Sequence, residues 1–245
     1  SMKSSETNSE TTYNGSVSGS TTNLQDSDKL ISLCLKGDWI MVEQILRNIK
    51  RGHSSLSVAE EDNGLTPLMV AVKENKLVVV ERLMELGVNL NDRAKDGRTV
   101  MHFAAAYAKD DIIKILITKK ADLSILGGPN DELPLHVACA RTSGALTIVQ
   151  LILKAMGKDG RLSQDKNGSI PLFMAAETGN IAVCRELLAQ SVEQQLTTQR
   201  KDNGDTVLHI ACRRRDIDLV KLLVEFGAPL GIQNDDGPTA LHLAA

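Results

Sequence analysis

A ten-residue unit recurs six times along this 245-residue chain, and this repetition constrains the fold more than any single motif. The units begin at Asn63, Asp96, Asp131, Asn167, Asn203 and Asp236 and read NGLTPLMVAV, DGRTVMHFAA, DELPLHVACA, NGSIPLFMAA, NGDTVLHIAC and DGPTALHLAA. The histidine position of successive units is separated by 33, 34, 37, 36 and 33 residues. A period of this length predicts a stack of similar small units, each of which contacts its neighbours.

Each unit has the chemistry of a helix that begins directly after a tight turn. In five of the six units an Asn-Gly or Asp-Gly pair forms the turn, and in three units proline occupies the first helical position, where its missing N–H costs nothing. A second segment with a broad aliphatic face follows, as in 79–84 and 219–223, and Gly87 and Gly227 end it. Hydroxyls that can cap the first helix stand at Thr66, Thr99, Thr206 and Thr239. The pattern predicts an all-α chain of helix pairs with projecting turns, which we call fingers.

Four of the five histidines recur at the repeat spacing, namely His102, His136, His209 and His242. Zinc needs its ligands within about 2 Å of one ion, whereas helices of adjacent units pack about 8–10 Å apart. These histidines therefore cannot share a metal, and no metal ligand is expected. We expect each imidazole to bridge the capping threonine and a neighbouring finger.

Composition excludes several classes of function. The net charge is −3 with mixed signs, so a nucleic-acid partner is not expected. No stretch approaches the roughly 18 unbroken apolar residues of a membrane span, which predicts no direct membrane insertion. The cysteines form no CxxC pair and sit in apolar helical patterns, which favours reduced core thiols and a cytoplasmic location.

Catalytic chemistry is also not indicated. The chain has no Ser/His/Asp spacing, no GxGxxG after a strand and no phosphate loop. We therefore expect no catalytic residue, no cofactor-binding residue and no cofactor, and we predict that the chain is not an enzyme.

Arg213, Arg214 and Arg215 are the main candidate partner-binding residues. They follow the first helix of the sixth repeat, and arginine grips carboxylates bidentately, so an acidic protein partner is indicated. The alternative is a solvated charge run balanced by Asp216 and Asp218. A weaker version of the same signal is the pair Lys119 and Lys120.

Composition and period divide the chain into three parts. Residues 1–23 are polar and lack the apolar side chains needed for a core, so a disordered tail is predicted. Residues 24–60 form an atypical capping repeat in which Asp28 replaces the capping threonine, and 61–245 hold the remaining repeats. The longer segments around 157–160 and 191–199 are expected to be irregular fingers, or sites where the stack twists differently. The last repeat stops within its first helix, so we expect further repeats in a longer parent protein.

These features resemble the ankyrin-repeat family over residues 24–245. The T-P-L-H-x-A pattern, the V-V-x-L-L helix and the G-A-x-x-N loop are each closely matched, as in TPLMVA from Thr66, LVKLL from Leu219 and GVNLN from Gly87. The resemblance implies an ankyrin-repeat solenoid of helix-turn-helix repeats with projecting β-turn fingers. It also implies a protein-binding or tethering function, and it places the arginine cluster near the concave groove where partners dock.

Two segments also resemble the start of the ankyrin array of TRPN mechanosensory channels. They are LISLCLKGDWIMVEQILRNIKRGH from Leu30 and ACRRRDIDLVKLLVEFGAPLGIQNDDGPTALHLAA from Ala211. This resemblance implies a homotetrameric cation channel of the plasma membrane, with this part on the cytoplasmic side as a tether to microtubules. The alternatives are a generic cytosolic adaptor that binds a globular partner or peptide, and an enzyme whose catalytic domain lies downstream.

Overall fold

The computed structural model describes residues 22–50, 54–157 and 159–245. Within these ranges all regular structure is helical, and two isolated antiparallel bridges, Gly127–Glu132 and Gln233–Thr239, close the bases of two fingers. The predicted all-α fold of helix pairs is confirmed. The predicted tail lies outside the described residues except for its last two positions, because the first helix begins at Thr22.

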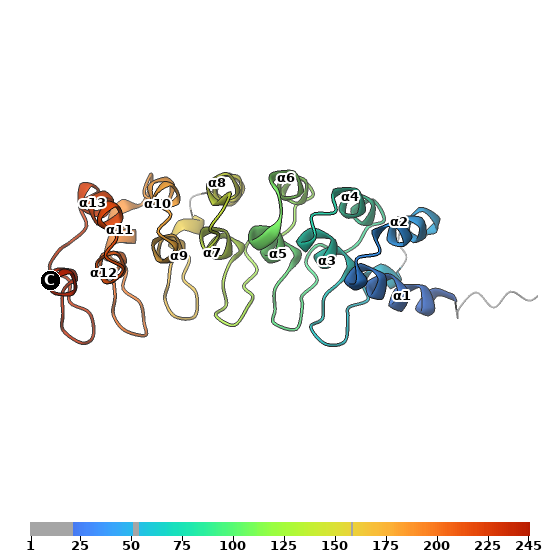
Figure 1. Ribbon diagram of the computed structural model, residues 1–245, viewed down its shortest axis with the longest axis horizontal. Coiled ribbons are helices and arrows are strands. Elements are labelled where there is room, and N and C mark those ends of the chain that lie inside the picture. The colour runs from blue at the N-terminus through green and yellow to red at the C-terminus, as the bar shows by residue number, and fades with distance from the viewer. Residues whose placement is uncertain (1–21, 51–53, 158) are drawn as a thin grey trace, which may run out of the picture.

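The helices form two parallel rows, with the fingers extending from one side (Figure 1). We call the row next to the fingers the inner helices and the other row the outer helices. The inner helices are α1 (Thr22–Lys36), α3 (Pro67–Lys73), α5 (Val100–Tyr107), α7 (Pro134–Cys139), α9 (Pro171–Thr178), α12 (Val207–Arg213) and α14 (Ala240–Ala244). The outer helices are α2 (Trp39–Asn48), α4 (Leu77–Glu85), α6 (Asp110–Thr118), α8 (Ala145–Met156), α10 (Ile181–Leu187) and α13 (Ile217–Glu225). The short helices η1 (Ser54–Ser57), η2 (Asp159–Leu162) and α11 (Val192–Thr197) lie in connections between repeats.

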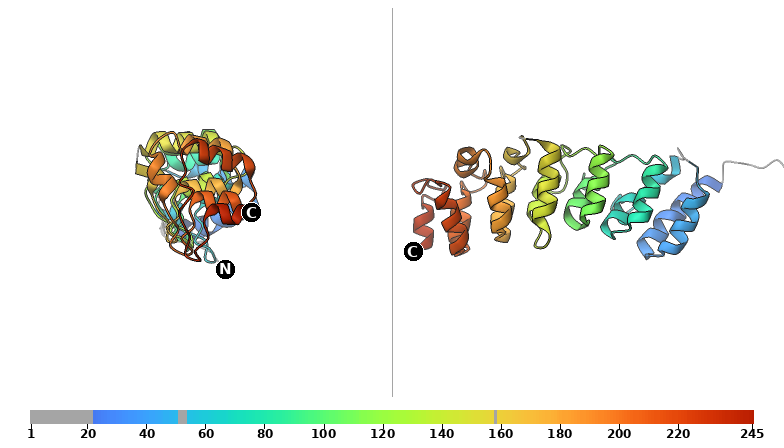
Figure 2. Two further views of the ribbon diagram at one scale, coloured as in Figure 1. Left: turned by 90° about the vertical axis from the view of Figure 1, so that its left-hand side faces the viewer. Right: turned by 90° about the horizontal axis from the view of Figure 1, so that it is seen from above.

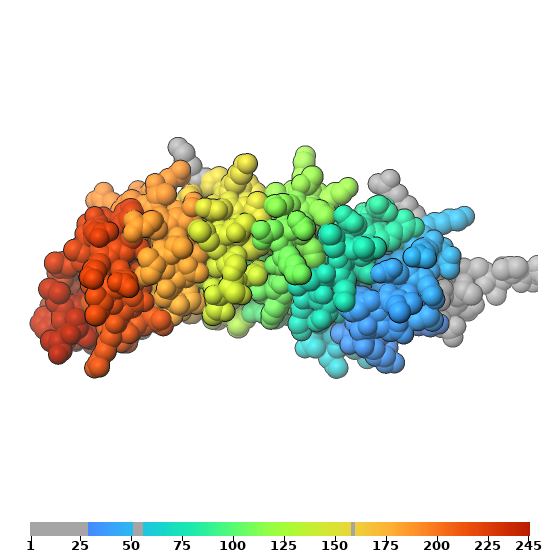
Figure 3. All heavy atoms as spheres, turned by 45° about the horizontal axis from the view of Figure 1, so that its top comes forward, coloured from blue at the N-terminus to red at the C-terminus, as the bar shows by residue number. Residues whose placement is uncertain are grey.

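Each repeat packs on the next in both rows. From α1 to α14 every inner helix contacts its successor, and the same holds for the outer helices from α2 to α13. Seen along the long axis the helix pairs overlie one another, and from above the molecule is an elongated array (Figure 2). The space-filling view shows neighbouring repeats in continuous contact (Figure 3).

Small and aliphatic side chains make this packing possible. In five inner helices an alanine of the repeat pattern is fully buried, which lets adjacent helices approach closely: Ala71, Ala104, Ala138, Ala175 and Ala211. The outer helices contribute fully buried leucines at Leu83, Leu116, Leu187 and Leu223. The buried residues of all repeats join into one continuous core.

Two local expectations are wrong. Asp28 lies inside α1 and is not its N-cap, because the helix starts six residues earlier; in this repeat it is Asp38 that caps a helix, accepting from the N–H of Met41 at 3.2 Å. The segment expected to be irregular at 191–199 contains α11. Its Gln195 is fully buried and donates from Nε2 to the carbonyl oxygens of Leu187 and Gln190, which ties α11 to the end of α10.

Candidate functional site

The threonines and histidines of the repeat lie where each finger meets its inner helix. Thr66 accepts from the N–H of Met69 at 3.3 Å. In the third repeat, the N–H of Thr99 donates to Nδ1 of His102 at 3.0 Å, and Nε2 lies 2.9 Å from the carbonyl oxygen of Glu132 in the next finger. A backbone N–H can only donate and a carbonyl can only accept, so Nδ1 is unprotonated and Nε2 carries the hydrogen.

The same bridge recurs along the array. His136 accepts from the N–H of Leu133 at 3.1 Å and donates to the carbonyl oxygen of Ser169 at 3.0 Å. His209 bridges Thr206 and Pro238 in the same way, and Nδ1 of His242 accepts from Thr239. Because Leu133 still provides its backbone N–H, the loss of the threonine hydroxyl in this repeat does not break the bridge.

These imidazoles have a structural role, because in His102 and His136 both ring nitrogens form hydrogen bonds within the repeat array. Burial is the main cause that lowers the pKa of His102 and of His136, which keeps both rings neutral. No group of three metal-ligating side chains occurs in the described ranges. Burial also raises the pKa of Cys34 and of Cys184 to about 12, so these core thiols are poor nucleophiles.

All three arginines of the cluster are exposed, but Arg213 differs from the other two because it has a buried partner. Nη1 of Arg213, at the end of α12, lies 2.7 Å from Oδ2 of Asp205. The side chain of Asp205 is fully buried at the base of the finger that precedes α12. Oδ1 of that carboxylate accepts from Nδ2 of Asn234 in the next finger at 2.9 Å. Arg213 is therefore the counter-ion of a buried carboxylate, a role that sequence reasoning assigned to neither residue.

Arg214 and Arg215 are exposed at the turn between α12 and α13. The guanidinium of Arg214 and the carboxylate of Asp216 both lie beside Gly179 of the preceding repeat. Arg215 has a φ of +57°, a left-handed conformation that Gly179 holds at the equivalent turn with a φ of +70°. The two acids expected to balance the cluster have other partners, since Asp216 caps α13 through the N–H of Leu219 and Asp218 pairs with Lys221.

Lys119 and Lys120 lie at the end of α6 and are exposed. The helices α7 to α10 separate them from the arginines, so the structure does not bring the two basic candidates together. Lys120 lines a groove of about 1070 Å³ between the third and fourth repeats.

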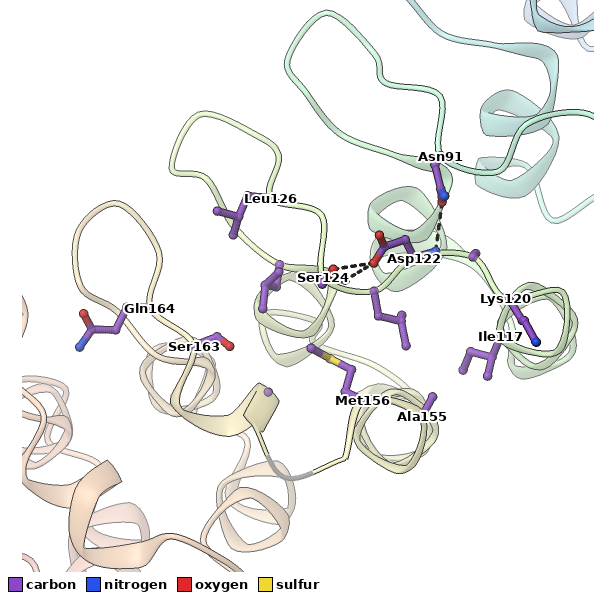
Figure 4. A pocket seen from close by; sticks show the side chains of 14 residues that line it. Asn91, Ile117, Lys120, Asp122, Ser124, Leu126, Ala155, Met156, Ser163 and Gln164 are labelled. Carbon is purple, nitrogen blue, oxygen red and sulfur yellow. Dashed lines mark hydrogen bonds between the residues drawn. The ribbon is translucent and has the colours of Figure 1, made fainter.

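Apolar and polar side chains from several elements line this groove (Figure 4). Ile117 and Met156, at the ends of α6 and α8, contribute apolar side chains to the lining. Asp122 accepts from the N–H and the hydroxyl of Ser124 at 2.8 and 2.6 Å, and these bonds lower the pKa of its carboxyl. Sequence reasoning missed the groove. The sequence feature that could have revealed the groove is the long spacing of 37 residues between the fourth and fifth repeats. The extra residues lengthen α8 and add η2, whose Gly160 lines the groove.

No helix in the described ranges is long and apolar enough to cross a membrane. Family models described as ankyrin repeats match residues 30–126 (3 copies) and 192–244 (many copies), which together make up more than half of the chain.

Several curated proteins contain a similar segment. The nuclear factor NF-kappa-B p105 subunit of Gallus gallus is 31% identical over 69% of this chain. The human transient receptor potential cation channel subfamily A member 1 is 29% identical over 80%, and human SH3 and multiple ankyrin repeat domains protein 2 is 27% identical over 84%. The chain spans 17%, 17% and 9% of the length of these relatives. From the repeat geometry and the two matching family models, we conclude that the chain belongs to the ankyrin-repeat family, whose repeats are protein–protein interaction modules.

Proposed function

We propose that the chain is a non-catalytic, cytoplasmic binding and tethering module. More narrowly, we propose that it is the membrane-distal end of a mechanically gated, tetrameric cation channel, which it links to microtubules. The observation that carries the tether is the uninterrupted core, in which each inner helix packs on the next from α1 to α14 and each outer helix packs on the next from α2 to α13. Such a stack transmits force from repeat to repeat along its length. The resemblance to TRPN channels and the match to a cation channel over 80% of the chain support the narrower proposal.

The microtubule contact is assigned to Arg214 and Arg215. Both side chains are exposed, and tubulin presents flexible acidic tails. Exposed charges attract one another weakly and are screened over about 8 Å at physiological salt, so binding should be weak and should decrease steeply as salt rises.

The test is co-sedimentation of the chain with polymerised tubulin at two salt concentrations. The double variant Arg214→Glu/Arg215→Glu should stay in the supernatant. The variant Lys109→Glu/Lys114→Glu, with the same charge change at the N-cap and in the middle of α6, should pellet like the wild type. Equal pelleting of both variants would show that the arginines are only a solvated face. If neither the wild type nor a tetramerised form with added avidity pellets, the microtubule link fails.

Arg213 must be left unchanged in this test. Its replacement by glutamate would place a second carboxylate against the buried Asp205. Because Arg213 is half exposed, we expect a cost of about 1–3 kcal/mol in the free energy of unfolding, below that of a fully buried pair. A triple arginine variant would therefore lower the melting temperature, contrary to what a surface cluster would do. Arg213→Glu serves as the control for lost folding.

The second candidate function is a generic adaptor that binds one globular partner or peptide. The groove beside Met156 favours it, because a lining that combines apolar side chains with polar groups suits a bound peptide. Six apolar spans in the downstream part of the parent gene would favour the channel, and their absence would favour the adaptor.

A further inference from the structure

Arg161 is a buried cation that forms no ion pair with any described carboxylate. It lies in η2 between the fourth and fifth repeats, and only 7% of its surface is exposed. Nη1 donates to Oε1 of Gln190 at 3.4 Å, and Nε has no hydrogen-bond partner among the described residues. No ion pair joins this guanidinium to a carboxylate in the described part of the chain, whereas the buried Asp205 is paired. Burying an unpaired charge costs free energy, and a carboxylate from another molecule would offset this cost.

Arg161 lines a cavity of about 340 Å³ between α8 and α10. This volume is near the lower end of ligand pockets, which span about 300–1,000 Å³. The amino group of Lys154 adds a second positive charge at an exposed position on the wall. The acidic side chain in the lining, Glu186, already accepts from Nε2 of Gln150 at 2.8 Å. The cavity therefore offers N–H donors and a net positive charge.

We propose that this cavity binds a carboxylate from an acidic segment of a partner protein, with Arg161 as the principal contact. The planar guanidinium matches a carboxylate through two parallel N–H···O bonds, and Lys154 steers the acidic segment to the entrance. A protein is the occupant because ankyrin repeats are protein-binding modules. The proposal uses that general function and does not depend on the channel or on microtubules.

The probe is a fluorescent peptide of about ten residues, rich in glutamate, titrated into the whole chain and followed by anisotropy. Arg161→Met should weaken binding by about tenfold or more, since charge-assisted bidentate bonds are lost. Lys154→Gln should weaken it by a smaller factor. Lys109→Gln, which removes an exposed lysine far from the cavity, should leave the affinity unchanged. Excess inorganic phosphate should compete poorly.

A second readout separates a binding role from a structural one. Replacing an unpaired buried charge by an apolar side chain of similar length is neutral or stabilising, so the melting temperature of Arg161→Met should not fall. If the melting temperature falls, the variants Lys154→Gln and Arg161→Lys are used for the binding test instead. Lys154 is exposed, and Arg161→Lys keeps the positive charge but removes the planar guanidinium that binds a carboxylate through two N–H groups.

Three results would overturn the proposal. One is equal peptide affinity in the wild type and Arg161→Met. Another is binding of inorganic phosphate without binding of the peptide, which would assign the cavity to a small anion. The third is loss of peptide binding in Arg214→Glu/Arg215→Glu with retention in Arg161→Met, which would move the acidic contact to the turn between α12 and α13. Loss of microtubule pelleting alone would leave this proposal intact.

Discussion

Single residues in left-handed backbone conformation mark where the sequence departs from its own pattern. Gly87 and Gly227 end their outer helices with φ values of +85° and +84°, and Lys120 stands at the same position after α6 with a φ of +62°. A residue with a Cβ pays a steric cost there that glycine does not. Lys120→Gly should therefore raise the free energy of unfolding by about 0.5–1 kcal/mol, as measured by denaturant titration.

The adjacent Lys119 provides the matched control, because its φ is −81° and it is also exposed. Here glycine adds freedom to the unfolded chain without relieving any strain, so Lys119→Gly should destabilise by about 0.5–1 kcal/mol. Effects of the same sign at both positions would contradict the steric explanation. The positive φ of Lys120 would then have no measurable effect on stability beyond that of Lys119.

At the scale of elements, the histidines join each finger to the next one. Nδ1 of His102 must stay unprotonated to accept from Thr99, and burial lowers the pKa of His102 and of His136 in the folded state. The unfolded pKa is about 6.5, so between the folded and unfolded values only the unfolded chain binds the proton. Stability is then complete above about pH 6.5 and decreases as the pH falls below it.

We expect both histidines to contribute to a loss of unfolding free energy as the pH falls from about 7 to about 5.5. Denaturant titration at the two pH values measures it. The variant His102→Met introduces the residue that the second repeat has at this position, Met69. It should lower the free energy of unfolding at neutral pH and reduce the loss of that free energy at acidic pH. An unchanged pH dependence in this variant would rule out His102 as the titrating group.

The sequence predicts those parts of the fold and site whose chemistry is local. Thr66 caps a helix through a residue three positions away, and the His102 bridge repeats with the period, so both follow from spacing. The pairing of Arg213 with Asp205 was missed because the acids adjacent in sequence, Asp216 and Asp218, seemed the natural partners. Burial of Arg161 was unpredictable because it depends on how extra residues between two repeats fold back on α8 and α10.

The molecule as a whole behaves as a linear array, because each helix contacts its own partner and its counterparts in the adjacent repeats. The outer helix α13 packs on α12 in its own repeat and on α10 in the preceding one. The outer helix α6 has neighbours on both sides, α4 and α8. Stability in such an array is a sum of repeat and nearest-neighbour terms, so damage should remain near its origin.

Leu223→Ala and Leu116→Ala test this expectation, because both side chains are fully buried at equivalent positions of α13 and α6. Each change should cost about 2–5 kcal/mol through the cavity it leaves. Hydrogen exchange should show lost protection in α12 and α13 for Leu223→Ala, with α3 and α4 retaining wild-type protection. For Leu116→Ala the loss should spread to both sides, into α4 and α8. Uniform loss of protection from α1 to α14 in either variant would mean that the array unfolds as one cooperative unit, and a tether with that property would yield to force all at once.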